Sequence, residues 1–117
     1  LRHVSVHVTG VGRAAARTAT DRILRESRAP RLVIAAGFCG ALASHLKVGD
    51  VVTCPRVVTV DHLVATPAEK RRLAAESGAA AVDMESAAVA EVCAERGVPF
   101  VAVRAVSDTV DTALSPE

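Results

Sequence analysis

The sequence has few aromatic side chains and no excess of either charge, and both features narrow the function classes open to it. It contains no Trp or Tyr, and its Phe residues are Phe38 and Phe100. Lys and Arg together number 14 against 13 Asp and Glu, which gives a formal net charge of +1 at pH 7. A nucleic-acid interface is strongly basic and often carries aromatic residues on which bases stack. This composition therefore argues against nucleic acid as a partner.

The sequence is also poor in cysteine and has no long apolar run. Its three cysteines, Cys39, Cys54 and Cys93, are odd in number and show no Cys-x-x-Cys spacing, which disfavours both a disulfide framework and a metal site. The longest uncharged run, residues 32–46, falls short of the roughly 20 residues needed to span a bilayer. We expect a soluble, cytoplasmic protein without a membrane span and without a cofactor.

The pattern of hydrophobic residues predicts alternating strands and helices. Hydrophobic residues make up 50% of the chain, enough to build the core of a single domain over residues 1–117. Val- and Ala-rich runs predict strands at 4–8, 32–36, 51–54, 57–60, 79–82 and 100–106, and the stretches between them predict helices at 14–28, 67–77 and 84–96. This order predicts an α/β fold of three layers, with a mixed, mostly parallel central sheet flanked by helices.

The clearest local signal is a helix start at Thr66-Pro67-Ala68-Glu69. Thr66 is expected at the N-cap, Pro67 at the first helical position, and Glu69 reaching back to the cap, which together form a capping box. Gly78 is expected to end this helix, because glycine readily adopts the left-handed conformation of a helix C-terminus. Asp83 is expected to cap the next helix.

Glycine-rich segments that follow strands are candidate binding sites, because ligands of open α/β sheets bind beyond the carboxyl ends of the strands. Gly10-Val11-Gly12 precedes a helix and offers backbone N–H groups to an anion. It lacks the third glycine of the dinucleotide fingerprint, so tight packing is the other interpretation. Gly37-Phe38-Cys39-Gly40 lets the backbone approach a flat ligand, or forms a plain turn. Cys39 is interpreted as a buried filler rather than a nucleophile, because no His lies nearby in the sequence.

Acidic residues follow two further strands. Asp83 is expected to cap a helix, which leaves Glu85 free to point into the crevice, where a carboxylate suits the adjacent hydroxyls of a ribose. Arg104 and Asp108 share one face of the last strand. A buried arginine needs a partner, so we expect Arg104 to meet an acid in the site. Asp108 is either a turn or capping residue or a group that takes part in the chemistry.

Two stretches of the sequence resemble a known family. The stretches Ala81-Val82-Asp83-Met84-Glu85-Ser86-Ala87-Ala88 and Val103-Arg104-Ala105-Val106-Ser107-Asp108 are similar to the purine/uridine phosphorylase superfamily. They are most similar to its methylthioadenosine/adenosylhomocysteine nucleosidase branch and to hopanoid-associated phosphorylase-like proteins. Residues 37–42 and 48–52 resemble the family's glycine-rich loop and the strand after it. The spacing of the Met-Glu and Ser-Asp pairs makes the resemblance specific, and it runs over nearly the whole chain. It implies the nucleoside phosphorylase-like fold and cleavage of the N-glycosidic bond of a purine nucleoside.

The resemblance implies roles for individual residues. Glu85 is expected to bind the ribose hydroxyls, and Met84 to pack on the sugar. Asp108 is expected to protonate or hydrogen-bond N7 of the purine, with Ser107 orienting it. Leu63 stands where the family stacks an aromatic ring on the base, and Phe38 is a possible substitute from the other side. The further substrate-binding residues implied are Cys39, Gly40 and Val64.

The resemblance also bears on the nucleophile. Arg104 matches an arginine that nucleosidases of the family use near the attacking water. Phosphorylases of the family hold phosphate through an Arg and a Ser where this chain has Ala35 and Phe38. Water is therefore favoured over phosphate, with Arg13 or Arg31 as alternative sources of positive charge that could hold phosphate.

The resemblance also sets a requirement on the acid. General-acid catalysis raises a reaction rate by about 10²–10⁴-fold. To act as a general acid, Asp108 must hold a proton near neutral pH, which requires burial or a nearby like charge.

The chain departs from the family pattern in three places. The family begins with another strand that carries residues for the nucleophile, and it continues past Asp111 with a helix. It also has roughly thirty more residues between the strands at 51 and 57. These differences predict a domain that is incomplete at both ends and has a gap at Cys54-Pro55-Arg56. A neighbouring subunit often completes the 5′ pocket in this family, so the resemblance implies a homo-oligomer.

Two competing interpretations stay open. The first is a nucleoside-binding protein of the same fold without turnover. Release of free base from adenosine-type substrates, lost in Asp108→Asn, would exclude it. The second is a Rossmann-type nucleotide-binding module built on Gly10-Val11-Gly12, which would bind a dinucleotide tightly. A phosphate-dependent purine nucleoside phosphorylase is the alternative within the family.

Overall fold

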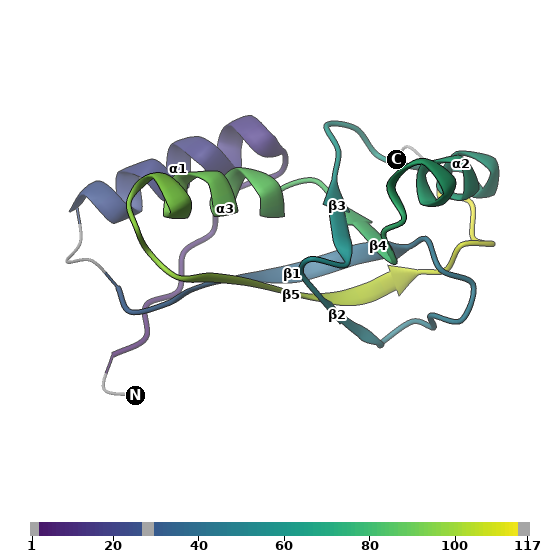
Figure 1. Cartoon of the computed structure of the whole chain (residues 1–117), viewed down its shortest axis with the longest axis horizontal. Helices are drawn as coiled ribbons and strands as arrows, with labels where there is room; N and C mark the ends of the chain where they lie inside the picture. Colours follow the sequence, from purple (N-terminus) through teal and green to yellow (C-terminus); the bar gives the residue numbers. More distant parts are fainter. Residues whose placement is uncertain (1–2, 27–29, 115–117) are drawn as a thin grey trace.

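The computed structural model describes residues 3–26 and 30–114, which contain three helices and five strands (Figure 1). The helices are α1 (Arg13–Glu26), α2 (Pro67–Ser77) and α3 (Ser86–Glu95). The strands are β1 (Val33–Ala41), β2 (Val51–Thr53), β3 (Val57–Thr59), β4 (Ala81–Asp83) and β5 (Phe100–Asp108). None of the helices in the described part of the chain is long and apolar enough to cross a membrane.

The five strands form one mixed sheet in the order β2-β5-β1-β4-β3. The long strands β1 and β5 run parallel, as do β3 and β4, whereas β1–β4 and β2–β5 are antiparallel. Parallel pairing of β1 with β5 brings their carboxyl ends to the same place, where Gly40 is the partner of Asp108. The predicted α/β fold with a mixed sheet flanked by helices is confirmed.

The helices are divided between the two ends of the sheet. Figure 1 shows α1 and α3 side by side over the first halves of β1 and β5, with α2 at the opposite end. The small residue Ala16 and the branched Val92 are fully buried where α1 packs on α3. A second core cluster lies among β1, β2, β4 and β5, around Ala41, Val52, Ala81 and Val106. These two clusters leave the strand ends between α3 and α2 as the place where polar groups gather.

The described structure corrects the sequence prediction at two strands. Residues 4–8 form no strand, and Val4, Val6 and Val8 are exposed. Alternation is a local pattern, whereas a strand needs a neighbour for its backbone, and no described strand pairs with this segment. The second correction is that Gly37-Phe38-Cys39-Gly40 is not a turn or loop but the continuation of β1. Its pairing with β5 supplies the hydrogen bonds that extend the strand.

The predicted helix start is confirmed. The side chain of Thr66 accepts a hydrogen bond from the backbone N–H of Glu69 at 3.2 Å, with Pro67 in the first helical turn. Gly78 ends α2 in the left-handed conformation, with φ of 70°. The carboxylate of Glu69, which was expected to reach back to the cap, instead contacts His62 at 2.8 Å. This contact ties α2 to the loop that precedes it.

Candidate functional site

A small pocket lies where the ends of β1, β4 and β5 meet the loop that follows β3. It has a volume of about 50 Å³, well below the roughly 300–1,000 Å³ of a typical ligand pocket. The lining residues are Gly40, Val60, His62, Leu63, Val64, Val82, Asp83, Met84, Asp108 and Leu114.

Asp108 is one of two buried acids that line this pocket, with 7% of the residue exposed; the other is Asp83, at 5%. The Ser107 hydroxyl donates a hydrogen bond to its Oδ1 at 2.9 Å. Nζ of Lys70 lies 2.7 Å from its Oδ2. Oδ2 accepts no well-aligned hydrogen bond from any described residue, so the contact with Lys70 is an ion pair. A Cβ on Gly40 would lie 3.0 Å from Oδ2, which shows how closely the backbone of β1 approaches the carboxyl group.

Burial and a nearby like charge were the two surroundings expected for Asp108, and the structure shows the burial. The charged group in contact with Asp108 is the cation Lys70, not a like charge. Lys70 was not among the residues that the sequence singled out.

Arg104 lies at the centre of a second buried cluster. Its Nε is 3.1 Å from Oδ2 of Asp83, and its Nη1 is 3.5 Å from Oε1 of Glu85. Asp83 is held further by the hydroxyls of Thr59, at 2.6 Å, and of Ser86. The expectation that Arg104 meets an acid is confirmed. A Cβ on Gly37 would lie 2.5 Å from Nη1 of Arg104, so the guanidinium occupies the space above a glycine.

Glu85 is the N-cap residue directly before α3 and is less free than expected. Its Oε2 accepts a hydrogen bond from the backbone N–H of Gly12 at 2.9 Å, and its Oε1 faces Arg104. Gly12 adopts a φ of 97°, which favours glycine. The N–H group that the sequence analysis offered to an anion thus binds a carboxylate of the same chain. The Glu85 side chain is 17% exposed, so it remains accessible at the edge of the cluster.

The structure brings most of the predicted site residues together. Five of them line the pocket: Gly40, Leu63, Val64, Met84 and Asp108. Three more bind their neighbours through the contacts described above: Glu85, Arg104 and Ser107. Ser107 also donates to the carbonyl of Cys39 at 3.3 Å.

Phe38 and Cys39 do not line the pocket. Phe38 is 73% exposed, because successive side chains of a strand point to opposite faces and its neighbour Cys39 points inward. The structure therefore does not place Phe38 as a substitute for the missing aromatic. Burial raises the pKa of the Cys39 thiol to about 11. A thiol of that kind is protonated at neutral pH, which agrees with its interpretation as a filler.

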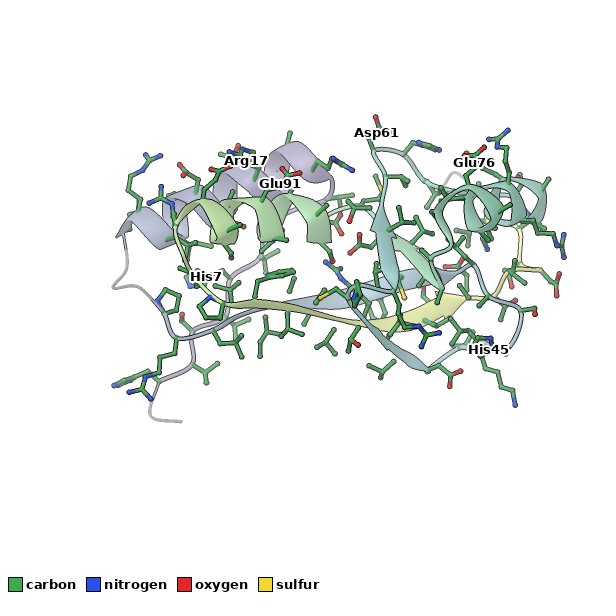
Figure 2. The ribbon with its side chains drawn as sticks, in the orientation of Figure 1. His7, Arg17, His45, Asp61, Glu76 and Glu91 are labelled. Carbon is green, nitrogen blue, oxygen red and sulfur yellow. The ribbon has the colours of Figure 1, made fainter. Side chains whose placement is uncertain are left out.

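His62 lines the pocket together with Leu63 and Val64, and all three belong to the segment Asp61-His62-Leu63-Val64 that the resemblance places where the family contacts the base. Its Nδ1 lies 3.0 Å from Oδ1 of Asp61 and its Nε2 lies 2.8 Å from Oε2 of Glu69. The hydrogen bond with Asp61, and then that with Glu69, raise the pKa of His62. Asp61 lies at the tip of the loop above β3 (Figure 2). Within the described ranges, no three His, Cys, Asp or Glu side chains come together as metal ligands would.

The fold and the site define a class: an α/β domain whose strand ends hold a buried acid beside a carboxylate–arginine cluster. The family model described as the phosphorylase superfamily matches residues 2–59 and 53–117. The chain belongs to that superfamily, as the resemblance implied.

Several known proteins are similar to this chain. It is 30% identical, over 154 aligned residues, to a 5′-methylthioadenosine/S-adenosylhomocysteine nucleosidase of Actinobacillus succinogenes, an alignment that covers 88% of this chain and 66% of the relative. The structure of the enzyme of the same name from Neisseria meningitidis, in complex with methylthio-immucillin-A, matches with a TM-score of 0.80 and 27% identity over 89% of this chain and 67% of the other. The S-adenosylhomocysteine nucleosidase of Streptococcus pyogenes matches with a TM-score of 0.77 and 25% identity over 88% and 65%. The chain thus spans about two thirds of the length of these relatives.

Proposed function

We propose that this chain carries the active site of an N-glycosidase that hydrolyses purine nucleosides of the adenosine type. The observation that carries the proposal is the position of Asp108, a buried acid in a pocket that also holds Met84, beside the Glu85–Arg104 cluster. The nucleosidase names of the similar proteins support the same reaction.

In the proposed reaction, the bond between C1′ of the ribose and the purine nitrogen breaks, and its electron pair leaves with the base. Asp108 transfers its proton to N7, so that the base departs as a neutral molecule. Water adds its oxygen to C1′ and releases a proton to solvent, and the Asp108 carboxylate takes up a proton from solvent to complete the cycle. The Ser107 hydroxyl at 2.9 Å orients the carboxyl group for this transfer.

The neighbouring side chains suit the sugar. Glu85 is the proposed acceptor for the ribose hydroxyls, and its contacts with Gly12 and Arg104 fix its direction at the start of α3. Met84 provides the apolar surface for the ribose. Gly40, Leu63 and Val64 are the proposed neighbours of the base, and Arg104 is the proposed group beside the attacking water.

Water is the proposed nucleophile because the residues in the positions expected to hold phosphate do not suit it. Phe38, where phosphorylases of the family carry a serine, is an exposed apolar side chain. Arg13, an alternative source of charge, donates to the carbonyl of Thr59 at 2.8 Å. Measuring base release with and without inorganic phosphate distinguishes hydrolysis from a phosphate-dependent reaction.

The assay measures release of free base from adenosine, 5′-methylthioadenosine and S-adenosylhomocysteine, with and without inorganic phosphate. We expect phosphate-independent release, and a loss of about 10²–10⁴-fold in kcat for Asp108→Asn. Asp111→Asn is the matched control, because Asp111 is an exposed acid three residues further along that pairs with Arg71. Strict dependence on phosphate would overturn hydrolysis, and activity retained in Asp108→Asn would overturn the role of the acid.

We further propose that related full-length chains carry an additional segment between β2 and β3. Two observations support it: the alignment with the Actinobacillus succinogenes relative spans 154 residues, more than the 117 of this chain, and the family model matches in two stretches that overlap at 53–59.

We also propose that the protein is a homo-oligomer in the cytoplasm. Light scattering after gel filtration tests the oligomer, and a monomeric mass would exclude it.

A further inference from the structure

Lys70 is an unusual residue in this chain. The 14 basic residues comprise twelve arginines and only two lysines, Lys47 and Lys70. Lys47 is exposed, whereas Lys70, on α2, has 0% exposure. Burying a charged side chain is unfavourable unless it is paired and hydrogen-bonded. The position of Lys70 therefore needs a reason that packing alone does not provide.

Three oxygen atoms surround the side-chain nitrogen of Lys70. Nζ donates to the carbonyl oxygens of Thr109 and Thr112, at 2.7 Å each, and lies 2.7 Å from Oδ2 of Asp108. Two of these contacts are hydrogen bonds, and the third is the ion pair with the acid. Arginine presents its donors in a planar fork and cannot direct three of them from one point.

All three acceptors belong to the end of β5 and the turn that follows it. Lys70 thus ties residues 108–112 to α2, and the Ser107 hydroxyl holds the other oxygen of the Asp108 carboxyl group. The backbone N–H of Leu114 donates to the carbonyl of Ala65 at 2.7 Å, which binds the same turn to the loop before α2. The orientation of the acid is therefore set by a residue on another element.

We propose that Lys70 is a positioning residue for Asp108, which it holds toward the purine while its charge stabilises the carboxylate left after proton transfer. The proposal rests on the proposed function, in which Asp108 is the acid. A cation beside a carboxyl group favours the ionised form. Lys70 thereby favours the carboxylate that remains on Asp108 after proton transfer to the base.

Other charged and titratable groups surround Asp108, and none of those described makes an ionic contact with it. Asp83 on β4 and His62 on the loop after β3 line the same pocket. Cys39 on β1 is a buried thiol, and Arg104 on β5 is engaged by Asp83 and Glu85. Lys70 is the group whose charge acts directly on the acid.

The principal test compares Lys70→Met with Lys47→Met, the same replacement at the exposed lysine. We expect Lys70→Met to lower kcat by up to about 100-fold with little change in KM, because the acid loses its fixed orientation. The alkaline limb of the kcat/KM profile should move to higher pH, since Asp108 keeps its proton longer without the cation. Lys47→Met should match the unmodified protein. An unchanged kcat or an unmoved alkaline limb in Lys70→Met would overturn the proposal.

Two measurements keep the test decisive if Lys70→Met does not fold. Lys70→Arg retains the charge, so its alkaline limb should stay in place while kcat falls; a shifted limb would count against the role of the charge. The second measurement needs no turnover: the ¹⁵Nζ resonance of Lys70, assigned by elimination with Lys47→Met, should be that of a slowly exchanging ammonium and should move in Asp108→Asn. Absence of that signal would overturn the ion pair. A protein with the signal but without base release from any nucleoside would instead contradict the proposed function.

Discussion

Replacing Arg104 with Met removes the cation that neutralises the carboxylate of Asp83. The two side chains are 7% and 0% exposed, and Arg104 Nε lies 3.1 Å from Asp83 Oδ2. Removing one partner of a buried ion pair costs about 3–5 kcal/mol. Asp83 retains the Thr59 hydroxyl at 2.6 Å and the backbone N–H of Ser86 at 3.2 Å, so we expect the lower end, about 3 kcal/mol. For a domain of this size that loss lowers Tm by about 10 °C.

The assay is urea and thermal denaturation of Arg104→Met, Asp83→Asn and the double variant. The double variant should lose less stability than the sum of the single variants, because it leaves no unpaired buried charge. Arg17→Met is the matched control. Arg17 is 47% exposed and pairs across the α1–α3 surface with Glu95, at 2.8 Å, and with Glu91 (Figure 2). An exposed pair of this kind contributes little.

Two results would refute this reasoning. The first is a loss of stability in Arg104→Met no larger than in Arg17→Met, which would mean that Asp83 is solvated or protonated without its partner. The second is strict additivity in the double variant, which would mean that the two side chains do not act on one another.

Two further predictions concern α2 and the loop before it. Thr66→Ala removes the acceptor for the Glu69 N–H and should lower the free energy of unfolding by about 1 kcal/mol in urea denaturation, whereas Thr66→Ser should not. His62 has a pKa raised above its ordinary 6.5 by Asp61 and Glu69, so its stabilising contribution is complete below that pH and is lost as the pH rises through the folded-state value. The difference in unfolding free energy between the unmodified protein and His62→Gln should therefore narrow from about pH 5.5 to about pH 8.5; a constant difference would show that the charge of His62 contributes nothing.

The sequence was sufficient to predict structural features that depend on residues close to one another in the chain. The Thr66 cap and the Gly78 helix end were predicted because a cap is made within one turn of the chain. The shared face of Arg104 and Asp108 followed from the two-residue period of a strand, and the need of Arg104 for an acid followed from the free energy of burying a charge.

Other features depend on partners that are distant in sequence. Residues 4–8 alternate as a strand does, but alternation does not supply a pairing partner. A plain turn was one of two interpretations of Gly37-Phe38-Cys39-Gly40, and pairing with β5 makes the segment part of a strand instead. Lys70 was missed because its contact with Asp108 joins α2 to the end of β5, and a lysine on a helix gives no local sign of such a contact. Only the scarcity of lysine in an arginine-rich chain could have drawn attention to it.

The charges around the pocket are suited to the proposed reaction in one further respect. Lys70 and Arg104 are two cations, and Asp83, Glu85 and Asp108 are three acids in contact with them. With a proton on Asp108 the charges balance. As that proton moves to the base, a negative charge appears on Asp108 while a positive charge develops on the sugar in the oxocarbenium-like transition state. The negative charge on Asp108 thus appears at the same step as the positive charge on the sugar. Lys70 already faces Oδ2 of Asp108, which carries part of that negative charge.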